Sequence, residues 1–256
     1  AVDPSEGGRT MRSTGRLNYH YDTTSGGRFF ANAYAQYYRF DLFTNFTFFQ
    51  NDPLTGDGFQ QSDRRIMYGG DIGYKQKGRW FDMDGAATVG VQSRVDHIHA
   101  RLGPQVLRNP LGSTSDTDIT EASYAPFFKL EVQPAPWMRL AGGIRSEVFT
   151  FDVRNRCQTC VTQPSGTADS GLMLPKANLI LGPWLRTEFF LNYGEGYHSN
   201  DARSAVTPAA SPLARAKSYE VGLRSRPWGS DGIELTATVW ALDMKQELVF
   251  VGDEGT

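Results

Sequence analysis

The segment WFDMDGAATVGVQSRV (residues 80–95) decides the fold class, because apolar and polar side chains alternate along its sixteen residues. Odd positions carry residues such as Met83 and Val89, whereas even positions carry residues such as Asp84 and Arg94. Successive side chains of a β-strand point to opposite faces of the sheet, so this period of two gives one apolar and one polar face. The segment is therefore predicted to be one long strand.

The same alternation recurs in residues 137–152, 185–193 and 218–225, and no segment shows the apolar stripe of an amphipathic helix. We therefore predict an all-β, antiparallel fold with about ten strands. Their expected ranges are 12–23, 28–50, 62–75, 80–98, 119–132, 137–152, 171–181, 184–197, 217–226 and 231–250.

Short and long connections alternate between these strands, as expected when tight turns lie at one end of a sheet and long loops at the other. The predicted short turns are residues 24–27, 76–79, 133–136, 181–184 and 226–232. The predicted long loops are residues 51–61, 102–118, the segment around the two cysteines, and residues 198–216.

The length of the strands favours a membrane barrel over a soluble sheet. Soluble strands usually have about 3 to 10 residues, whereas residues 29–50 contain no Pro or Gly that would end a strand. A tilted strand crosses the hydrocarbon with about 9 to 11 residues, and the excess can project above it. Aromatic residues expected near the membrane interfaces are Tyr34, Tyr38, Phe46, Phe48, Trp137, Trp184 and Trp228.

The opposite, charged face of these strands is predicted to line a wet lumen. The chain has 20 Arg and only six Lys, which suits a wall where guanidinium groups pair with carboxylates. The expected lumen-lining residues are Asp82, Asp84, Arg94, Arg139, Arg145, Glu147, Arg186, Glu188, Glu220 and Arg224.

Composition excludes several other classes. The formal net charge of −2 leaves no basic block for a phosphate backbone, so a nucleic acid is not an expected partner. The 32 aromatic residues argue against disorder, and no window of 18 uncharged apolar residues provides a membrane-spanning helix. A soluble β-sandwich or propeller, serving as a binding or adhesion module, remains an alternative.

The two ends of the chain both fall on the predicted long-loop side. No secretory signal is visible at the N-terminus, and the last predicted strand is followed only by a few residues. Complete outer-membrane barrels normally have both termini on the short-turn side, so we expect this chain to be an internal part of a larger barrel, with unpaired backbone groups at its two edge strands.

Three strings resemble the barrel of TonB-dependent outer-membrane receptors, and the resemblance extends over the whole chain. They are DLFTNFTFFQNDPLTGDGFQQSDRR (41–65), LNYGEGYHSNDARS (191–204) and KSYEVGLRSRPWGSDGIELTATVWALDMKQELVFVGDEGT (217–256). The resemblance implies a partial barrel domain over residues 1–256, taken from a barrel of the 22-strand type in the outer membrane of a Gram-negative cell.

The same resemblance implies the function and the partners. Such receptors take up scarce nutrients, for example iron chelates, and are transporters without catalytic activity or a cofactor. Their partners would be outer-membrane lipid, the plug domain that fills the lumen, the TonB complex and a small-molecule ligand. The plug domain, the TonB-binding box and a last strand that ends in an aromatic residue are all missing from this sequence.

One polar cluster is predicted to contact a ligand at the extracellular end of a strand. Its residues are Glu195, Tyr197, His198, Asn200, Asp201 and Arg203. The alternative is that these side chains only order the loop through turn and hydrogen-bond chemistry.

Three smaller motifs were considered for metal or redox chemistry. His97 and His99 share one face of a strand but form only two possible ligands, and the spacing of Asp52, Asp57 and Asp63 does not fit an EF-hand loop. Cys157 and Cys160 supply too few ligands for zinc, and a small disulfide at the tip of a loop is the simpler interpretation. No metal site is therefore expected.

A small complete barrel with protease activity is the remaining alternative. Outer-membrane proteases of about ten strands have Asp and His pairs at the extracellular rim, and this chain offers a comparable set. The residues are Asp96, His97, His99, His198 and Asp201.

Overall fold

The computed structural model describes residues 3–157, 160, 164–200, 202–206, 212–229 and 232–245. It contains ten long strands, one two-residue strand and one short helix. The elements are β1 (Gly7–Asp22), β2 (Gly27–Thr44), β3 (Phe59–Trp80), β4 (Met83–Val106), β5 (Asn109–Pro110), β6 (Ser115–Ala135), β7 (Met138–Asn155), β8 (Gly166–Trp184), β9 (Thr187–Ser199), α1 (Ala202–Ala205), β10 (Leu213–Ser225) and β11 (Leu235–Met244). No helix in these ranges is long and apolar enough to cross a membrane.

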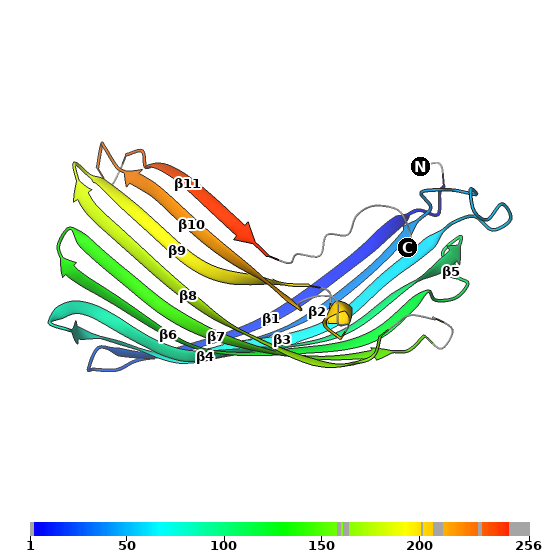
Figure 1. Cartoon of the computed structure of the whole chain (residues 1–256), viewed down its shortest axis with the longest axis horizontal. Helices are drawn as coiled ribbons and strands as arrows, with labels where there is room; N and C mark the ends of the chain where they lie inside the picture. Colours follow the sequence, from blue (N-terminus) through cyan, green and yellow to red (C-terminus); the bar gives the residue numbers. More distant parts are fainter. Residues whose placement is uncertain are drawn as a thin grey trace.

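All the strands belong to one antiparallel sheet in which each long strand pairs with its neighbours in sequence. The order is β1-β2-β3-β4-β6-β7-β8-β9-β10-β11, and β5 pairs only with β4. The sheet curves into an open trough, with the short turns on the left of Figure 1 and β5 on the right. In the described part of the chain, β1 and β11 are its two edges and do not pair with each other.

The all-β prediction and the ten long strands are confirmed, but several boundaries were wrong. Strand β2 ends at Thr44, so Phe46 and Phe48 lie in the following loop and not on a strand. Residues 102–118 are largely strand, because β4 continues to Val106 and β6 begins at Ser115. The predicted turn at residues 76–79 lies within β3, which pairs with β4 as far as Trp80 and Met83.

The two faces of the sheet differ in chemistry, as the alternation predicts. The face that carries Arg94 and Glu147 is called the inner face here, and the opposite face is called the outer face. Large hydrophobic side chains are exposed on the outer face of successive strands: Leu17, Tyr19, Tyr37, Ile66, Ile72, Val89, Val91, Phe128, Ile144, Val148, Leu191 and Val221. An exposed apolar face of this extent suits contact with lipid.

Two expected interface aromatics were assigned to the wrong face. Tyr34 and Tyr38 share the inner face of β2 with Asn32, whose amide donates a hydrogen bond of 2.8 Å to Asp71. Tyr38 also lies beneath the guanidinium of Arg12, 5.3 Å from its ring centroid. Their assignment failed because aromatic residues occur on both faces of this strand.

Three phenylalanines of the inner face each lie over a glycine of the neighbouring strand. Phe30 is opposite Gly73, Phe127 is opposite Gly90 and Phe190 is opposite Gly222. A Cβ at any of these glycines would come within 2.3 to 2.7 Å of the aromatic ring. Small residues on the inner side thus leave room for aromatic rings where the sheet bends.

Three tight connections have two central residues with positive φ but contain no glycine there. They are Phe81–Asp82, Leu107–Arg108 and Leu185–Arg186, with φ values between 48° and 66°. This left-handed conformation is the one that glycine and asparagine adopt most readily in two-residue hairpin turns. The prediction of turns from glycine and proline therefore missed the true position of the β3–β4 turn.

The largest apolar cluster lies at the loop end of the inner face. Phe149, Phe151 and Val153 of β7 pack there with Ile98 of β4 and Ile119 of β6. The end of β9, the start of β10 and the segment between them pack against this cluster through Tyr197, Ala202, Ala205, Val206 and Leu213. The connection is therefore held against the inner face by hydrophobic packing.

A charge placed on the outer face should oppose membrane assembly. We expect Val89→Arg and Leu140→Arg each to destabilise the chain in bilayers by about 2 to 4 kcal/mol, because an arginine near the midplane loses its hydration. Val89 is 57% exposed on this face, and Leu140 lines an apolar groove of the same face with Phe128 and Ile144. Urea titration of the chain in phosphatidylcholine bilayers measures the effect.

The matched control is Gln92→Arg, which adds the same side chain to the inner face of β4, opposite Asp71 and Ala125. This control should assemble with nearly unchanged stability. Equal destabilisation by Gln92→Arg and Val89→Arg would contradict the assignment of the two faces.

The left-handed turn residue Asp82 provides a test of backbone strain. Asp82→Gly should raise the free energy of unfolding by about 1 kcal/mol, because φ at this position is 61° and glycine adopts it without a Cβ clash. Asp84→Gly, in the extended strand β4, should instead lower stability. Denaturant unfolding in detergent compares the two, and a loss of stability in both variants would argue against strain in the turn.

Candidate functional site

Charged residues of the inner face are paired within single strands. Arg94 Nη2 lies 2.7 Å from Asp96, and Arg145 Nη2 lies 2.5 Å from Glu147. Residues two apart on a strand share a face, so each arginine can reach the carboxylate next to it. Glu147 has no exposed surface and Asp96 is 3% exposed, which makes these pairs part of the packed wall.

A second set of charges links strands near the short turns. The carboxylate of Glu188 in β9 accepts hydrogen bonds from Arg139 of β7 and from Arg224 of β10, the latter at 2.6 Å. Further along β9, the side-chain amide of Asn192 accepts a hydrogen bond of 2.7 Å from Asn178 and donates one of 3.2 Å to Glu220. The inner face therefore carries a polar lattice, interrupted by aromatic residues such as Phe190, that could face water or another polar domain.

Eight of the ten expected lumen-lining residues lie on the inner face, and two do not. Asp84, Arg94, Arg139, Arg145, Glu147, Glu188, Glu220 and Arg224 lie on this face. Asp82 and Arg186 instead occupy the two-residue turns of the β3–β4 and β8–β9 hairpins. Their assignment was wrong because the strand alternation was continued through the turns.

Further polar residues of the same lattice were not predicted from the sequence. Asn32 bonds to Asp71, and Lys75 Nζ lies 3.1 Å from Glu131. A signal was available in the sequence, since an arginine or lysine two residues from an acidic residue recurs at 39–41, 63–65, 94–96, 129–131, 145–147 and 152–154. The residues at these spacings form ion pairs with each other, on both faces of the sheet.

The structure separates the residues of the proposed ligand-contact cluster. Glu195 is 8% exposed and accepts a hydrogen bond from Tyr193, with Arg215 Nε 3.3 Å away. Tyr197 packs edge-on against Phe149, with 5.3 Å between ring centroids.

The remaining members of that cluster lie closer to the loop. His198 is exposed, and the backbone N–H of the buried Asn200 donates to the carbonyl of Pro212 at 3.0 Å. Arg203 of α1 reaches back to Ser115 of β6, with 3.3 Å between Nη1 and Oγ. Asp201 lies outside the described residues. Tyr197 and His198 are successive residues of β9, so their side chains point to opposite sides of the strand, and the structure does not gather the predicted cluster around one site.

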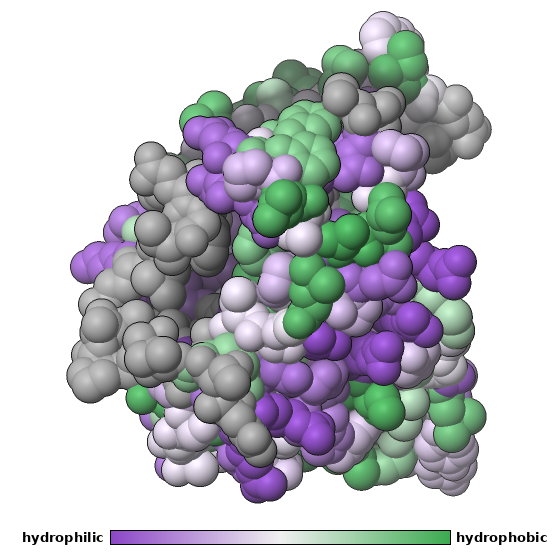
Figure 2. Space-filling view, turned by 90° about the vertical axis from the view of Figure 1, so that its right-hand side faces the viewer, coloured by the Kyte–Doolittle hydropathy of each residue, from purple (hydrophilic) through white to green (hydrophobic). Residues whose placement is uncertain are grey.

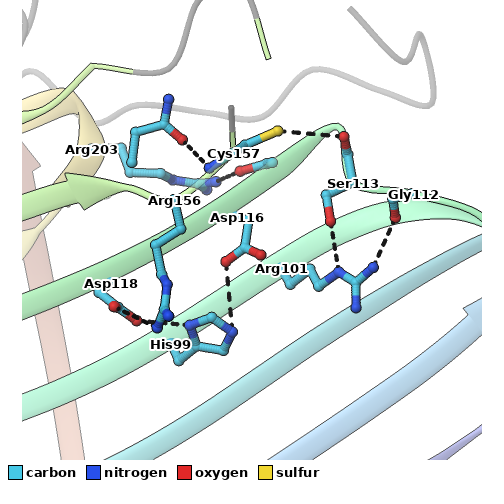
Figure 3. A network of polar contacts seen from close by, with 11 residues as sticks. His99, Arg101, Gly112, Ser113, Asp116, Asp118, Arg156, Cys157 and Arg203 are labelled. Atoms are coloured by element: carbon cyan, nitrogen blue, oxygen red, sulfur yellow. Dashed lines mark hydrogen bonds and ion pairs between the residues drawn. The ribbon is translucent and has the colours of Figure 1, made fainter. Parts of the chain in front are cut away.

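His97 and His99 lie together on the outer face, as their spacing predicts, and Asp96 lies on the inner face. His99 Nδ1 is 2.7 Å from Asp118 and its Nε2 is 3.6 Å from Asp116, while Arg156 also reaches Asp118 (Figure 3). His97 contacts Tyr68 and Thr120 instead. Within the described ranges no group of three or more His, Cys, Asp or Glu residues could hold a metal ion.

The two cysteines form a disulfide in the first half of the β7–β8 connection. Cys157 and Cys160 are bonded to each other, and both sulfur atoms lie 3.4 to 3.5 Å from the carbonyl oxygen of Ser113. Arg101 also bonds to this neighbouring connection, through Ser113 Oγ at 2.7 Å. The disulfide is thus within one connection and lies against the neighbouring β4–β6 connection, and Figure 3 shows Cys157 beside Ser113.

The three aspartates considered for calcium serve other purposes. Asp57 accepts the backbone N–H groups of Asn51 and Asp52, and these bonds lower the pKa of its carboxyl group. Asp52 accepts hydrogen bonds from Thr55 in the same loop, which lowers the pKa of Asp52. Asp63 pairs with Arg65 on the inner face. Asp52 and Asp57 thus order the loop before β3.

Comparison with known proteins identifies a family and a fold. A protein-family model described as "TonB dependent receptor-like, beta-barrel" matches residues 3–256. None of the curated protein sequences compared with the chain matches it.

Three solved structures illustrate the shared fold. The ferric citrate transporter FecA, in its unliganded form, aligns with a TM-score of 0.75 at 15% identity, over 93% of this chain and 35% of its own. The siderophore receptor PiuA from Acinetobacter baumannii gives 0.72 at 12% identity, over 92% and 40%. The ferric-catecholate import receptor Fiu from E. coli K12, in its closed form, gives 0.71 at 14%, over 99% and 43%. The chain thus spans about two fifths of the length of these proteins.

The buried pair of Arg145 and Glu147 should be essential to the inner wall. Arg145→Met should destabilise the chain by about 3 to 5 kcal/mol, because it leaves the fully buried Glu147 carboxylate without its cation. The double variant Arg145→Met/Glu147→Leu should recover most of this loss, which urea unfolding in detergent can measure. A double variant as unstable as the single one would indicate that packing, and not the unpaired charge, causes the effect.

Proposed function

The chain belongs to the TonB-dependent receptor β-barrel family, and we propose that it forms part of the wall of a receptor that takes up an iron chelate or a comparable scarce nutrient. Members of this family are outer-membrane transporters of Gram-negative bacteria. The observation that carries the proposal is the match of the family model across residues 3–256, together with long antiparallel strands that have an apolar outer and a charged inner face.

The proposed division of labour follows from these two faces. The outer face contacts lipid, and the polar lattice around Glu147 and Glu188 contacts the plug domain of the whole receptor. A ligand binds passively between the extracellular loops, where the exposed His198 and Arg203 of α1 are available to touch it. Release into the lumen then requires rearrangement of the plug, which the TonB complex drives with the inner-membrane proton gradient.

The iron-chelate class is favoured by what the structural neighbours transport. FecA is named as a ferric citrate transporter and Fiu as a ferric-catecholate import receptor. At 12 to 15% identity these likenesses concern the fold, so the ligand of this chain is a proposal.

The geometry disfavours the protease alternative. Asp96 is paired with Arg94 on the inner face, whereas His97 and His99 lie on the outer face of the same strand. A general base and its orienting carboxylate must lie within hydrogen-bond reach of each other and of one substrate. Asp96 does not meet that requirement for His97 or His99, because it lies on the other face of β4; the carboxylate that His99 does reach, Asp118, is also paired with Arg156.

Uptake of radioactive iron tests the proposed function. Cells that carry the gene for this chain are compared with a deletion strain, with iron supplied as ferric citrate or as a ferric-catechol complex. Uptake should disappear in the deletion strain and on addition of a protonophore, because transport depends on the proton gradient. Arg203→Ala should raise the half-saturating concentration several-fold, whereas Arg154→Ala, on the outer face, should leave it unchanged.

Uptake that persists after deletion for both iron complexes would remove the support for iron as the cargo. Uptake that is insensitive to the protonophore would contradict a TonB-dependent mechanism.

A further inference from the structure

The outer face changes from apolar to charged at one level of the sheet. Tyr37, Ile66 and His97 lie opposite one another in one transverse row of neighbouring strands. The next row lies two positions further along each strand toward the loops, and it contains Arg39, Arg64 and His99. The loop end of the molecule presents many hydrophilic residues between hydrophobic ones (Figure 2). The row therefore lies where an apolar lipid core would give way to headgroups.

Charges on the β4–β7 side of this level are balanced. His99 and Arg156 share Asp118, and Arg154 Nη2 lies 2.7 Å from Asp152. Arg101 donates to Ser113 and to the carbonyl of Gly112. Cations here thus have partners within the chain.

The β1–β3 side of the same level holds a pocket of about 360 Å³ whose charges are not balanced. Its lining includes Arg9, Arg39, Arg64 and Arg108 but only one carboxylate, that of Asp41. Four guanidinium groups and one carboxylate give the lining a net charge of +3. Asp41 is 6% exposed and is already paired with Arg39 at 2.8 Å.

Two of the four arginines are fixed by protein groups, and two have their donors free. Arg108 donates to the carbonyl oxygens of Ser5 and Glu6 at 2.8 and 3.0 Å and lies over the ring of Phe43. The guanidinium groups of Arg9 and Arg64 are exposed and have no hydrogen bond or ion pair with any residue that the structure describes, although Arg9 lies directly opposite Asp41 in the register of β1 and β2. Arg39 lies directly opposite Arg64 across β2 and β3, a like-charge arrangement that costs free energy without an anion between them.

We propose that this arginine pocket binds a phosphate monoester group, supplied by the headgroup of a phosphorylated lipid at the membrane surface. Guanidinium groups present paired N–H donors that match the oxygens of a phosphate. A monoester carries nearly two negative charges at neutral pH and would offset most of the excess positive charge. The level of the pocket, next to the last apolar row, favours a lipid headgroup over a free ion. This inference does not depend on the transported substrate.

Binding to two phosphate sources tests the proposal. The full chain in neutral detergent is titrated with inorganic phosphate, and the chain in phosphatidylcholine nanodiscs is compared with nanodiscs that also contain phosphatidic acid, a lipid with a monoester headgroup. We expect phosphatidic acid to be retained by the chain and to raise its thermal midpoint. The variant Arg9→Gln/Arg64→Gln should weaken this binding at least tenfold.

The matched control is Arg16→Gln/Arg154→Gln, which removes two exposed arginines from outside the pocket. It should bind phosphatidic acid like the unmodified chain. Specific binding of inorganic phosphate alone, lost only in the pocket variant, would support the phosphate site and overturn the lipid source. Equal losses in both variants, or no binding of either probe, would overturn the pocket itself. Both variants leave Asp41 and its ion pair intact, so a folded protein is available for comparison.

Discussion

Main-chain pairing between long neighbouring strands is the constraint on which the rest of this structure depends. The ladder between β3 and β4 runs without interruption from Phe59 to Trp80, and that between β2 and β3 covers eighteen residue pairs. In lipid an unpaired N–H or C=O group is costly, so a wall of this kind must satisfy its backbone groups strand by strand. Once the ladders are fixed, the register determines which side chains face lipid and which face the interior.

The inner face shows how so many charges can be accommodated on such a wall. Pairs such as Arg94–Asp96 and Arg145–Glu147 use the two-residue spacing of a strand, so each ion pair forms without any contribution from a distant loop. Glu188 adds links between strands by accepting bonds from Arg139 and Arg224. Burial of Glu147 is tolerated because its partner is fixed on the same strand.

The sequence was sufficient to predict the strands and most of the inner face, but not the turns or the outer pocket. Period-two alternation depends on side-chain chemistry alone, which is why Asp84, Arg139 and Glu220 were placed on one face. The turns at Phe81–Asp82 and Leu185–Arg186 have positive φ without glycine, so their residue types gave no signal. The arginine pocket depends on the register of three strands and on the return of Arg108 from a distant hairpin, and neither is visible in a linear sequence.

The loop end is held by a different interaction from the rest of the wall. Pairing between β8 and β9 ends at Lys176 and Gly194, whereas β9 and β10 remain paired as far as Ser199 and Leu213. Beyond that point, packing of Tyr197 and the α1 residues on the Phe149 and Phe151 cluster fixes the hairpin over the inner face. Arg203 of α1 adds a hydrogen bond to Ser115 of β6, so side-chain contacts hold this end of the chain where the ladder between β8 and β9 has stopped. Residues proposed to contact the ligand thus lie beyond the end of the β8–β9 ladder, on a segment whose position depends on packing against the wall as well as on its pairing with β10.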